Sequence, residues 1–124
     1  MGEKTLKQIF GADAEEAAVR HLEGQGFRIR DRNFHSRQGE LDVVAEKDDL
    51  LCFVEVRMRS DATWGDPSQT VSFAKQRRVV QAALRYLQVH HIADRMIRFD
   101  VVSIIGRGDA AQVEHIPGAF DAGM

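Results

Sequence analysis

The alternation of apolar and polar positions along the chain predicts two helices and five strands. Apolar residues recur at helical spacing in two segments, one rich in Ala and Glu that ends at Gly24, and one periodic from Lys75 onward. Runs rich in Val, Ile and Phe, separated by short polar turns, are typical of strands. The helices are expected at residues 12–24 and 71–90, and the strands at residues 27–34, 40–46, 50–58, 97–105 and 112–116.

This order of elements, αβββαβ followed by a short last strand, favours an α/β fold in which helices flank a mixed central β-sheet. The chain has 124 residues, of which 44% are hydrophobic, and only two prolines. A chain of this length buries one core of moderate size. We therefore expect one domain over residues 1–124, with its core at about residues 11–120.

Two acids, Asp42 and Glu55, interrupt strands that are otherwise typical of a buried sheet. If the hairpin between them turns on Asp48 and Asp49, Asp42 lies directly opposite Glu55. Opposed side chains have Cβ atoms roughly 4.5 to 5.5 Å apart, where like charges repel each other. A hard cation between the two carboxylates reverses that sign, because Mg²⁺ takes oxygen ligands and is commonly held by one or two carboxylates.

The same register pairs Lys47 with Leu50 and gives the hairpin one wholly apolar face. That face comprises Leu41, Val43, Ala45, Cys52, Val54, Val56 and Met58. In the alternative interpretation, the acids lie on the wet face of a one-sided sheet, where Glu40 pairs with Arg57.

A third acid, Glu15, falls within the apolar stripe of the first helix. At 100° per residue, Ala18, Val19 and Leu22 lie within about 100° of arc, the width of a core-facing stripe. Glu15 lies in the middle of that arc, whereas the other acids of the helix collect on another side. The pattern directs Glu15 inward, towards the sheet, and a place at the rim of the helix contact is the alternative.

Arg57 and Lys75 are the cations expected nearest to these acids. Arg57 stands two positions after Glu55. A guanidinium stays protonated, so it can clamp a phosphate but cannot act as a general base. Lys75 lies at the edge of the buried arc of the second helix, from where it could reach the carboxylates. A lysine that only extends its charge to solvent at the core boundary is the alternative.

An acid on one strand and E-x-K on the next, after a helix with a glutamate, resembles the PD-(D/E)xK nuclease superfamily with its restriction-endonuclease-like fold. The segments GELD, FVEVR, WGDP, AKQRR and RFDVV together are similar to the small bacterial YraN family. That family is similar in fold to archaeal Holliday-junction resolvases. The resemblance runs from about residue 11 to 120, and it implies a restriction-endonuclease-like fold.

Carried over residue by residue, the resemblance assigns metal binding to Asp42 and Glu55, with Glu15 acting directly or through water. The implied cofactor is Mg²⁺ or Mn²⁺. Arg57 stands where the superfamily has its lysine, and Lys75 is the candidate to replace that lysine, so the catalytic set comprises the three acids with Arg57 and Lys75. The implied activity is that of an endonuclease, a hydrolase of DNA phosphodiester bonds that acts on branched or single-stranded DNA.

Basic residues close to these segments are the expected nucleic-acid contacts. Arg28, Arg30 and Arg32 alternate along a strand, so we expect them on one face, where they either track a nucleic-acid backbone or face solvent. Trp64 is expected to stack on a base or to anchor its loop. The full set of predicted contacts is Arg28, Arg30, Arg32, Arg37, Arg59, Trp64, Arg77 and Arg78.

The net charge of −2 does not itself indicate a nucleic-acid binder, so two other functions stay open. Arg57 in place of lysine favours a catalytically weak or inactive nuclease fold that binds DNA or a protein partner. The net charge favours an interaction domain without nucleic acid. Resolvases act as symmetric dimers, so the resemblance also leaves a homodimer open.

The remaining features indicate a soluble, cytoplasmic protein without membrane contacts. The single Cys52 excludes an intrachain disulfide framework, and the N-terminal segment lacks the apolar centre of a signal peptide. No segment approaches the roughly 18 apolar residues that a membrane span needs. Asp100 in RFDVV is expected to bond the backbone or an arginine rather than a metal.

Overall fold

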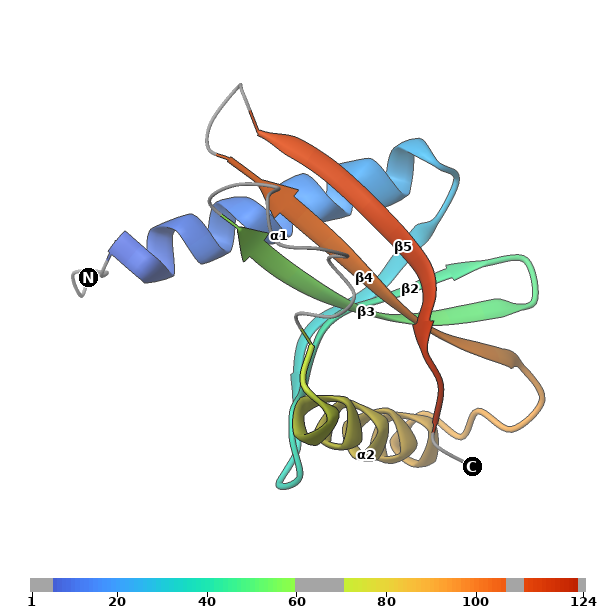
Figure 1. The fold of residues 1–124 in the computed structure, drawn as a ribbon. Coiled ribbons are helices and arrows are strands. Elements are labelled where there is room, and N and C mark those ends of the chain that lie inside the picture. The colour runs from blue at the N-terminus through green and yellow to red at the C-terminus, as the bar shows by residue number, and fades with distance from the viewer. Residues whose placement is uncertain (1–5, 60–70, 107–110, 123–124) are drawn as a thin grey trace, which may run out of the picture.

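The computed structural model describes residues 6–59, 71–106 and 111–122, with the side chains of residues 13 onward. In these ranges a five-stranded sheet lies between two helices, one on each face (Figure 1). The elements are α1 (Leu6–Gly24), β1 (Arg28–His35), β2 (Glu40–Lys47), β3 (Leu50–Arg59), α2 (Phe73–Val89), β4 (Met96–Ile105) and β5 (Gln112–Phe120). The predicted mixed α/β architecture is confirmed.

The strands of the sheet follow the order of the chain, β1-β2-β3-β4-β5. β3 and β4 pair in parallel, and the other neighbours pair antiparallel. A parallel pair needs a crossover connection, which here contains α2. β1 and β5 are therefore the edges of the sheet, and β3 lies at its centre.

Two element ends differ from the prediction. α1 begins at Leu6 rather than at residue 12. The helix therefore includes Gly11, although glycine is unfavourable inside a helix. β5 continues past Pro117 to Phe120. Proline lacks the N–H of a ladder donor, but edge strands tolerate it, and β5 is an edge strand. Among the described residues, no helix has the length and apolar character needed to cross a membrane.

Two apolar clusters, one on each face of the sheet, form the core. The α1 cluster comprises Ala14, Ala18, Val19, Leu22, Phe27, Val43, Ala45, Cys52, Val54, Val102 and Ile104. The α2 cluster comprises Leu41, Val44, Leu51, Phe53, Val79, Ala82, Ala83, Tyr86 and Phe99. β2 and β3 supply residues to both clusters, which explains their nearly continuous apolar runs. The one-sided sheet with a wet face is therefore wrong.

The β2–β3 hairpin has the predicted register and turn. Its ladder begins with the pair of Lys47 and Leu50, and the turn lies at residues 48–49. The next pair beyond the five pairs of this ladder would be Asp42 and Glu55. At that point Asp42 Oδ2 accepts a hydrogen bond from the backbone N–H of Val56, at 2.9 Å.

Leu41 packs on the other face from the one predicted. It belongs to the α2 cluster, together with Phe34, its partner on β1, rather than to the α1 cluster with Val43. Asn33, next to Phe34, has a φ of 55°. This left-handed conformation departs from extended strand geometry. The simple alternation of faces therefore fails at this end of the hairpin.

Candidate functional site

Glu55 is a buried carboxylate on the central strand. Only 1% of the residue is exposed, and it lies among apolar neighbours on β3. Lys75 Nζ, from the first turn of α2, lies 3.3 Å from Glu55 Oε1. Glu55 Oε2 is buried without a hydrogen-bond partner in the described part of the chain. A buried oxygen left unpaired costs about 1–3 kcal/mol, so half of this carboxylate lacks compensation.

The start of α2 fixes the position of Lys75. The side chain of Ser72 caps the helix by accepting a hydrogen bond from the Lys75 backbone N–H at 3.1 Å. The Gln76 side chain donates to the Val71 carbonyl at 3.0 Å. Both bonds tie the segment before α2 to its first turn, at the position where the Lys75 side chain extends towards the sheet.

The electrostatics of Asp42 and Glu55 are linked. Burial, followed by the charge of Asp42, raises the pKa of Glu55 to about 7, while Lys75 opposes this rise. Burial also raises the pKa of Asp42. The hydrogen bond from Val56 and the charges of Lys75 and Arg57 partly offset that effect. Burial and mutual repulsion therefore both disfavour the ionised forms of these two neighbouring carboxylates.

Glu15 approaches the same region from α1. Burial, followed by the charge of Asp42, raises the pKa of Glu15, against an opposing hydrogen bond with Asn33 and the charge of Arg32. Glu15 Oε1 is buried and has no hydrogen-bond partner among the residues described. The neighbouring Ala18 lies in the α1 cluster. Glu15 is half-buried with one carboxylate oxygen turned away from solvent, which agrees with both the inward position and the place at the rim of the helix contact.

The donor set of Glu15, Asp42 and Glu55 fits a hard divalent cation. Carboxylate oxygens are the preferred ligands of Mg²⁺ and Mn²⁺. A cation would also compensate one buried oxygen of Glu15 and one of Glu55 that have no hydrogen-bond partner in the part of the chain that the structure describes. Within residues 6–59, 71–106 and 111–122, no three acidic, imidazole or thiol side chains are grouped closely enough to enclose an ion in their present positions.

Three of the predicted cations act on these acids. The charges of Lys75 and Arg57 lower the pKa of Asp42, and that of Arg32 lowers the pKa of Glu15. Arg32 also donates to Glu16, on the outer side of α1, at 3.0 Å. The charges of these three cations therefore act on Asp42 and Glu15. Arg59 is half-buried at the end of β3.

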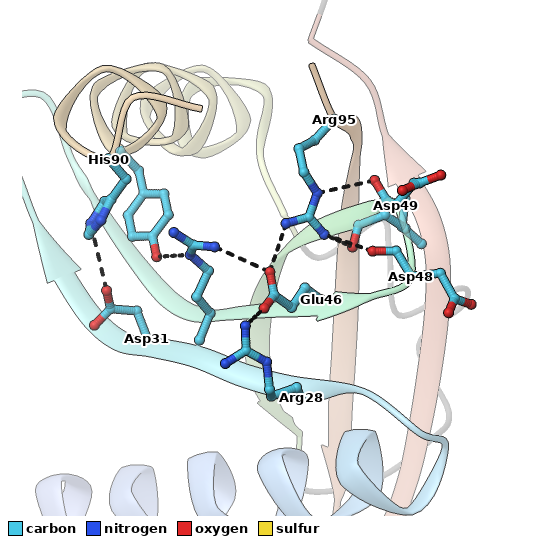
Figure 2. A network of polar contacts seen from close by, with 10 residues as sticks. Arg28, Asp31, Glu46, Asp48, Asp49, His90 and Arg95 are labelled. Carbon is cyan, nitrogen blue, oxygen red and sulfur yellow. Dashed lines mark hydrogen bonds and ion pairs between the residues drawn. The ribbon is translucent and has the colours of Figure 1, made fainter. Parts of the chain in front are cut away.

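Arg28 and Arg30 lie elsewhere, around Glu46 at the opposite end of β2 (Figure 2). Arg30 Nη1 lies 3.2 Å from Glu46 Oε2, Arg28 pairs with the other oxygen, and Arg95 Nη1 lies 2.8 Å from Oε2. Glu46 is four residues from Asp42, or roughly 13 Å along a strand. These two arginines hold a buried carboxylate and do not contribute to the rim of the acid site.

The prediction that Arg28, Arg30 and Arg32 share one face is wrong. Arg30 donates to Tyr86 Oη on α2 at 2.9 Å, whereas Arg32 contacts Glu16 on α1. The cause is a β-bulge in β1, where the register with β2 shifts between Ile29 and Asp31. A bulge inserts one extra residue, so the alternation of side chains reverses beyond it.

The other predicted nucleic-acid contacts are exposed or undescribed. Arg37 lies in the β1–β2 connection, and Arg77 and Arg78 are exposed side chains of α2. None of these three forms an ion pair with a residue in the described ranges. Trp64 lies outside the described residues.

Asp100 bonds an arginine and the backbone, as predicted. Arg98 donates to both its oxygens, at 2.8 and 2.9 Å, and the Gly118 N–H donates at 3.0 Å. His115 Nε2 lies 2.7 Å from Oδ2. Burial raises the pKa of Asp100, but these partners outweigh it and hold the pKa at about 2. Sequence reasoning missed His115 and the Glu46 network, because their partners lie at least 15 residues away along the chain. The sequence does contain a signal for the Arg98–Asp100 ion pair, because residues two apart on a strand point to the same face of the sheet.

Comparison with known proteins identifies relatives over almost the whole chain. The family model of the uncharacterised protein family UPF0102 matches residues 14–104. A UPF0102 protein of Myxococcus xanthus is 72% identical over 118 residues, which cover 95% of this chain and 94% of the relative. A UPF0102 protein of Syntrophotalea carbinolica is 44% identical over 111 residues, covering 90% of each chain. One of Rhodococcus opacus is 43% identical over 111 residues, covering 89% of this chain and 94% of the relative.

Proposed function

Because this chain belongs to the uncharacterised protein family UPF0102, also called the YraN family, whose name states no activity, we propose a function from its own site: a metal-dependent nuclease that hydrolyses DNA phosphodiester bonds. One observation carries the proposal. Asp42 and Glu55 are neighbouring, largely buried carboxylates, and Lys75 Nζ lies 3.3 Å from Glu55. A purely structural sheet has no need of such a costly arrangement.

Each residue of the site has a role that its position supports. Asp42 and Glu55 would hold Mg²⁺ or Mn²⁺, with Glu15 acting directly or through water. The bound metal would supply a water of lowered pKa and neutralise charge on the phosphoryl oxygens. Lys75 would orient the attacking water or the scissile phosphate from its place beside Glu55. Arg57, whose charge acts on Asp42, would clamp a phosphate through its planar fork.

A second candidate is a module of the same fold that binds DNA without cleaving it. Arg57 supports this candidate, since a guanidinium cannot take over the proton-transfer chemistry open to a lysine. The ion pair of Lys75 with Glu55 supports the nuclease instead, because it offers a lysine from a neighbouring helix at the same carboxylate. Activity measurements decide between the two candidates.

Mn²⁺ titration by calorimetry tests the site without any assumption about the substrate. We expect saturable binding to the unaltered protein, loss of binding in Asp42→Asn, and unchanged binding in the matched control Asp13→Asn, which alters an exposed carboxylate on α1. Equal binding to all three proteins would exclude this metal site. If metal binds, incubation of branched, flapped, single-stranded and duplex DNA with Mg²⁺ follows. Cleavage that Asp42→Asn and Lys75→Ala abolish supports the nuclease, and binding without cleavage supports the second candidate.

A further inference from the structure

A polar pocket opens beside Lys75 and is lined by neither Asp42 nor Glu55. It has a volume of about 440 Å³ and lies between the β1–β2 connection, residues 35–40, and the first two turns of α2. From α2 it is lined by Lys75, Arg78 and Val79. We call it the Arg78 pocket. Since Lys75 both lines it and contacts Glu55, the pocket and the acid site share one side chain.

The walls of the Arg78 pocket are fixed by close backbone packing. Ser36 and Gly39 close a tight turn, in which the Ser36 N–H and Oγ both donate to the Gly39 carbonyl, at 2.8 and 3.0 Å. Gly39 lies against α2 so closely that a Cβ there would be 2.7 Å from the Arg78 carbonyl oxygen. The connection is therefore docked on the helix, and the recess between them is part of the fold.

The pocket carries an excess of positive charge. Arg37 and Arg78 are exposed, and neither has an ion pair within the described parts of the chain. The acid that lines the pocket, Glu40, is contacted by His35 Nδ1 at 3.1 Å. Five arginines elsewhere in the described chain each contact a carboxylate: Arg28, Arg30, Arg32, Arg95 and Arg98. Guanidinium groups without a carboxylate partner are available to bind phosphate.

The groups that a nucleic acid exposes decide what the pocket can bind. In a duplex the bases are stacked inside, so a duplex could offer the pocket only its backbone phosphates. A single strand can instead place a whole nucleotide there, with its phosphate between the two guanidinium groups and its unstacked base in the pocket. The strand would then continue past Lys75 to the carboxylates.

We propose that the Arg78 pocket binds one nucleotide of a single-stranded polynucleotide, with the backbone phosphate held by Arg37 and Arg78, next to the phosphate at the acid site. This inference rests on the proposed function, which it narrows to substrates with a single-stranded segment beside the cleaved bond. The chemistry recognised is a phosphodiester with an unstacked base, and DNA and RNA both supply it.

Fluorescence anisotropy with labelled oligothymidylate in EDTA tests the pocket, because chelation prevents cleavage. For single strands the slope of log affinity against log salt is about 0.7 per phosphate contact. We expect Arg37→Ala combined with Arg78→Ala to weaken binding and to reduce that slope by about 1.4. The control Arg85→Ala removes an exposed arginine of α2 that lies outside the pocket, so its affinity for the oligothymidylate should equal that of the unaltered protein. Equal binding by the double variant and the unaltered protein would overturn the proposal.

Two further arms use duplex DNA and an oligouridylate. A duplex that binds as tightly as the single strand, with the same dependence on Arg37 and Arg78, would overturn the single-strand assignment. Tight binding of the oligouridylate, dependent on the same residues, would support the pocket and indicate RNA as its source. If the double variant cleaves DNA at the full rate, the proposed role of the pocket is wrong and the proposed nuclease activity is supported. If binding depends on Arg37 and Arg78 but no DNA is cleaved in Mg²⁺, the pocket is supported as a binding site and the proposed nuclease activity is wrong.

Discussion

Glu55 keeps a carboxylate on the central strand, with one oxygen near Lys75 and the other without a hydrogen-bond partner among the described residues. Its pKa is raised from 4.5 to about 7, so in this pH range the folded state holds a proton that the unfolded state has lost. The stability of the metal-free protein must therefore fall as pH rises from about 4.5 through 7. The ionised Glu55 carboxylate, which destabilises the metal-free protein above this pH range, is also the form that could bind a metal ion.

The substitution Glu55→Gln should therefore stabilise the metal-free protein at pH 8 and have little effect at pH 4. A pKa raised from 4.5 to about 7 corresponds to roughly 3 kcal/mol, an upper limit because the glutamine leaves Lys75 without its partner. Urea unfolding of both proteins in EDTA at the two pH values measures the difference. Equal stability at pH 8 would mean that Glu55 ionises without cost, contrary to its burial.

Residue types and local spacing were sufficient to predict the acid site. Asp42, Glu55 and Glu15 each interrupt an apolar pattern, and that interruption can be read from the sequence. Lys75 was within reach because its helical phase places it at the edge of the buried arc, and its contact with Glu55 is present. Whether these side chains bind a metal or catalyse a reaction stays a prediction, since that depends on ligands and substrates.

At the scale of elements, β1 is the strand that the sequence describes least well. Its bulge separates Arg30 from Arg32, and the left-handed Asn33 disturbs the facing of the strand. Neither feature has a clear signal in a strand-like run such as RIRDRNF, because both depend on how β1 fits β2 and the helices. The β2–β3 hairpin was predictable, since both faces are covered and its short turn fixes the register.

The contact between the β1–β2 connection and α2 gives a prediction for Gly39. A Cβ at this position would lie 2.7 Å from the Arg78 carbonyl oxygen, and backbone cannot move aside as a flexible side chain can. Gly39→Ala should therefore destabilise the protein by about 1–3 kcal/mol, the usual cost of overpacking. It should also weaken single-strand binding by displacing the connection.

Gly24→Ala is the matched control for Gly39→Ala. A Cβ at Gly24 meets nothing within 4 Å, and alanine is the better residue in a helix. Denaturant unfolding should therefore show no loss of stability for Gly24→Ala. Equal effects of the two substitutions would mean that the connection can leave α2 freely, which would also remove the basis for a preformed Arg78 pocket.

At the scale of the whole molecule, two charged clusters lie on opposite faces of one sheet. Glu46 and its three arginines join β1, β2 and the segment before β4 on the α2 side (Figure 2). Asp100 joins β4 to β5, and its partner His115 lies 2.9 Å from the side chain of Gln25, after α1. The near-neutral net charge therefore hides an uneven distribution of charge. The arginines around Glu46 and Asp100 are held in ion pairs, whereas Arg37 and Arg78 form no ion pair with a described residue.

The Asp100 cluster should set the acid limit of this fold. The pKa of the Asp100 carboxyl is about 2, below the usual 3.8, so the folded state favours the ionised form. The ionised Asp100 therefore adds stability at every pH above about 4. That contribution must be lost as pH falls from about 4 towards 2. Asp100→Asn should therefore cost about 2 kcal/mol or more at pH 7, because the amide lacks the charge and keeps only one of the two acceptor oxygens that Arg98 and His115 share.

The pH dependence separates this ionic role from simple packing. The loss caused by Asp100→Asn should shrink as pH is lowered towards 2, whereas a packing defect would persist at all pH values. Asp31→Asn is the control, since the Asp31 carboxylate is 41% exposed and lies 3.9 Å from His90, so its loss should change stability little. Unfolding by urea from pH 7 to 2 measures both variants. A constant loss for Asp100→Asn would show that its shape, rather than its charge, holds β4, β5 and α1 together.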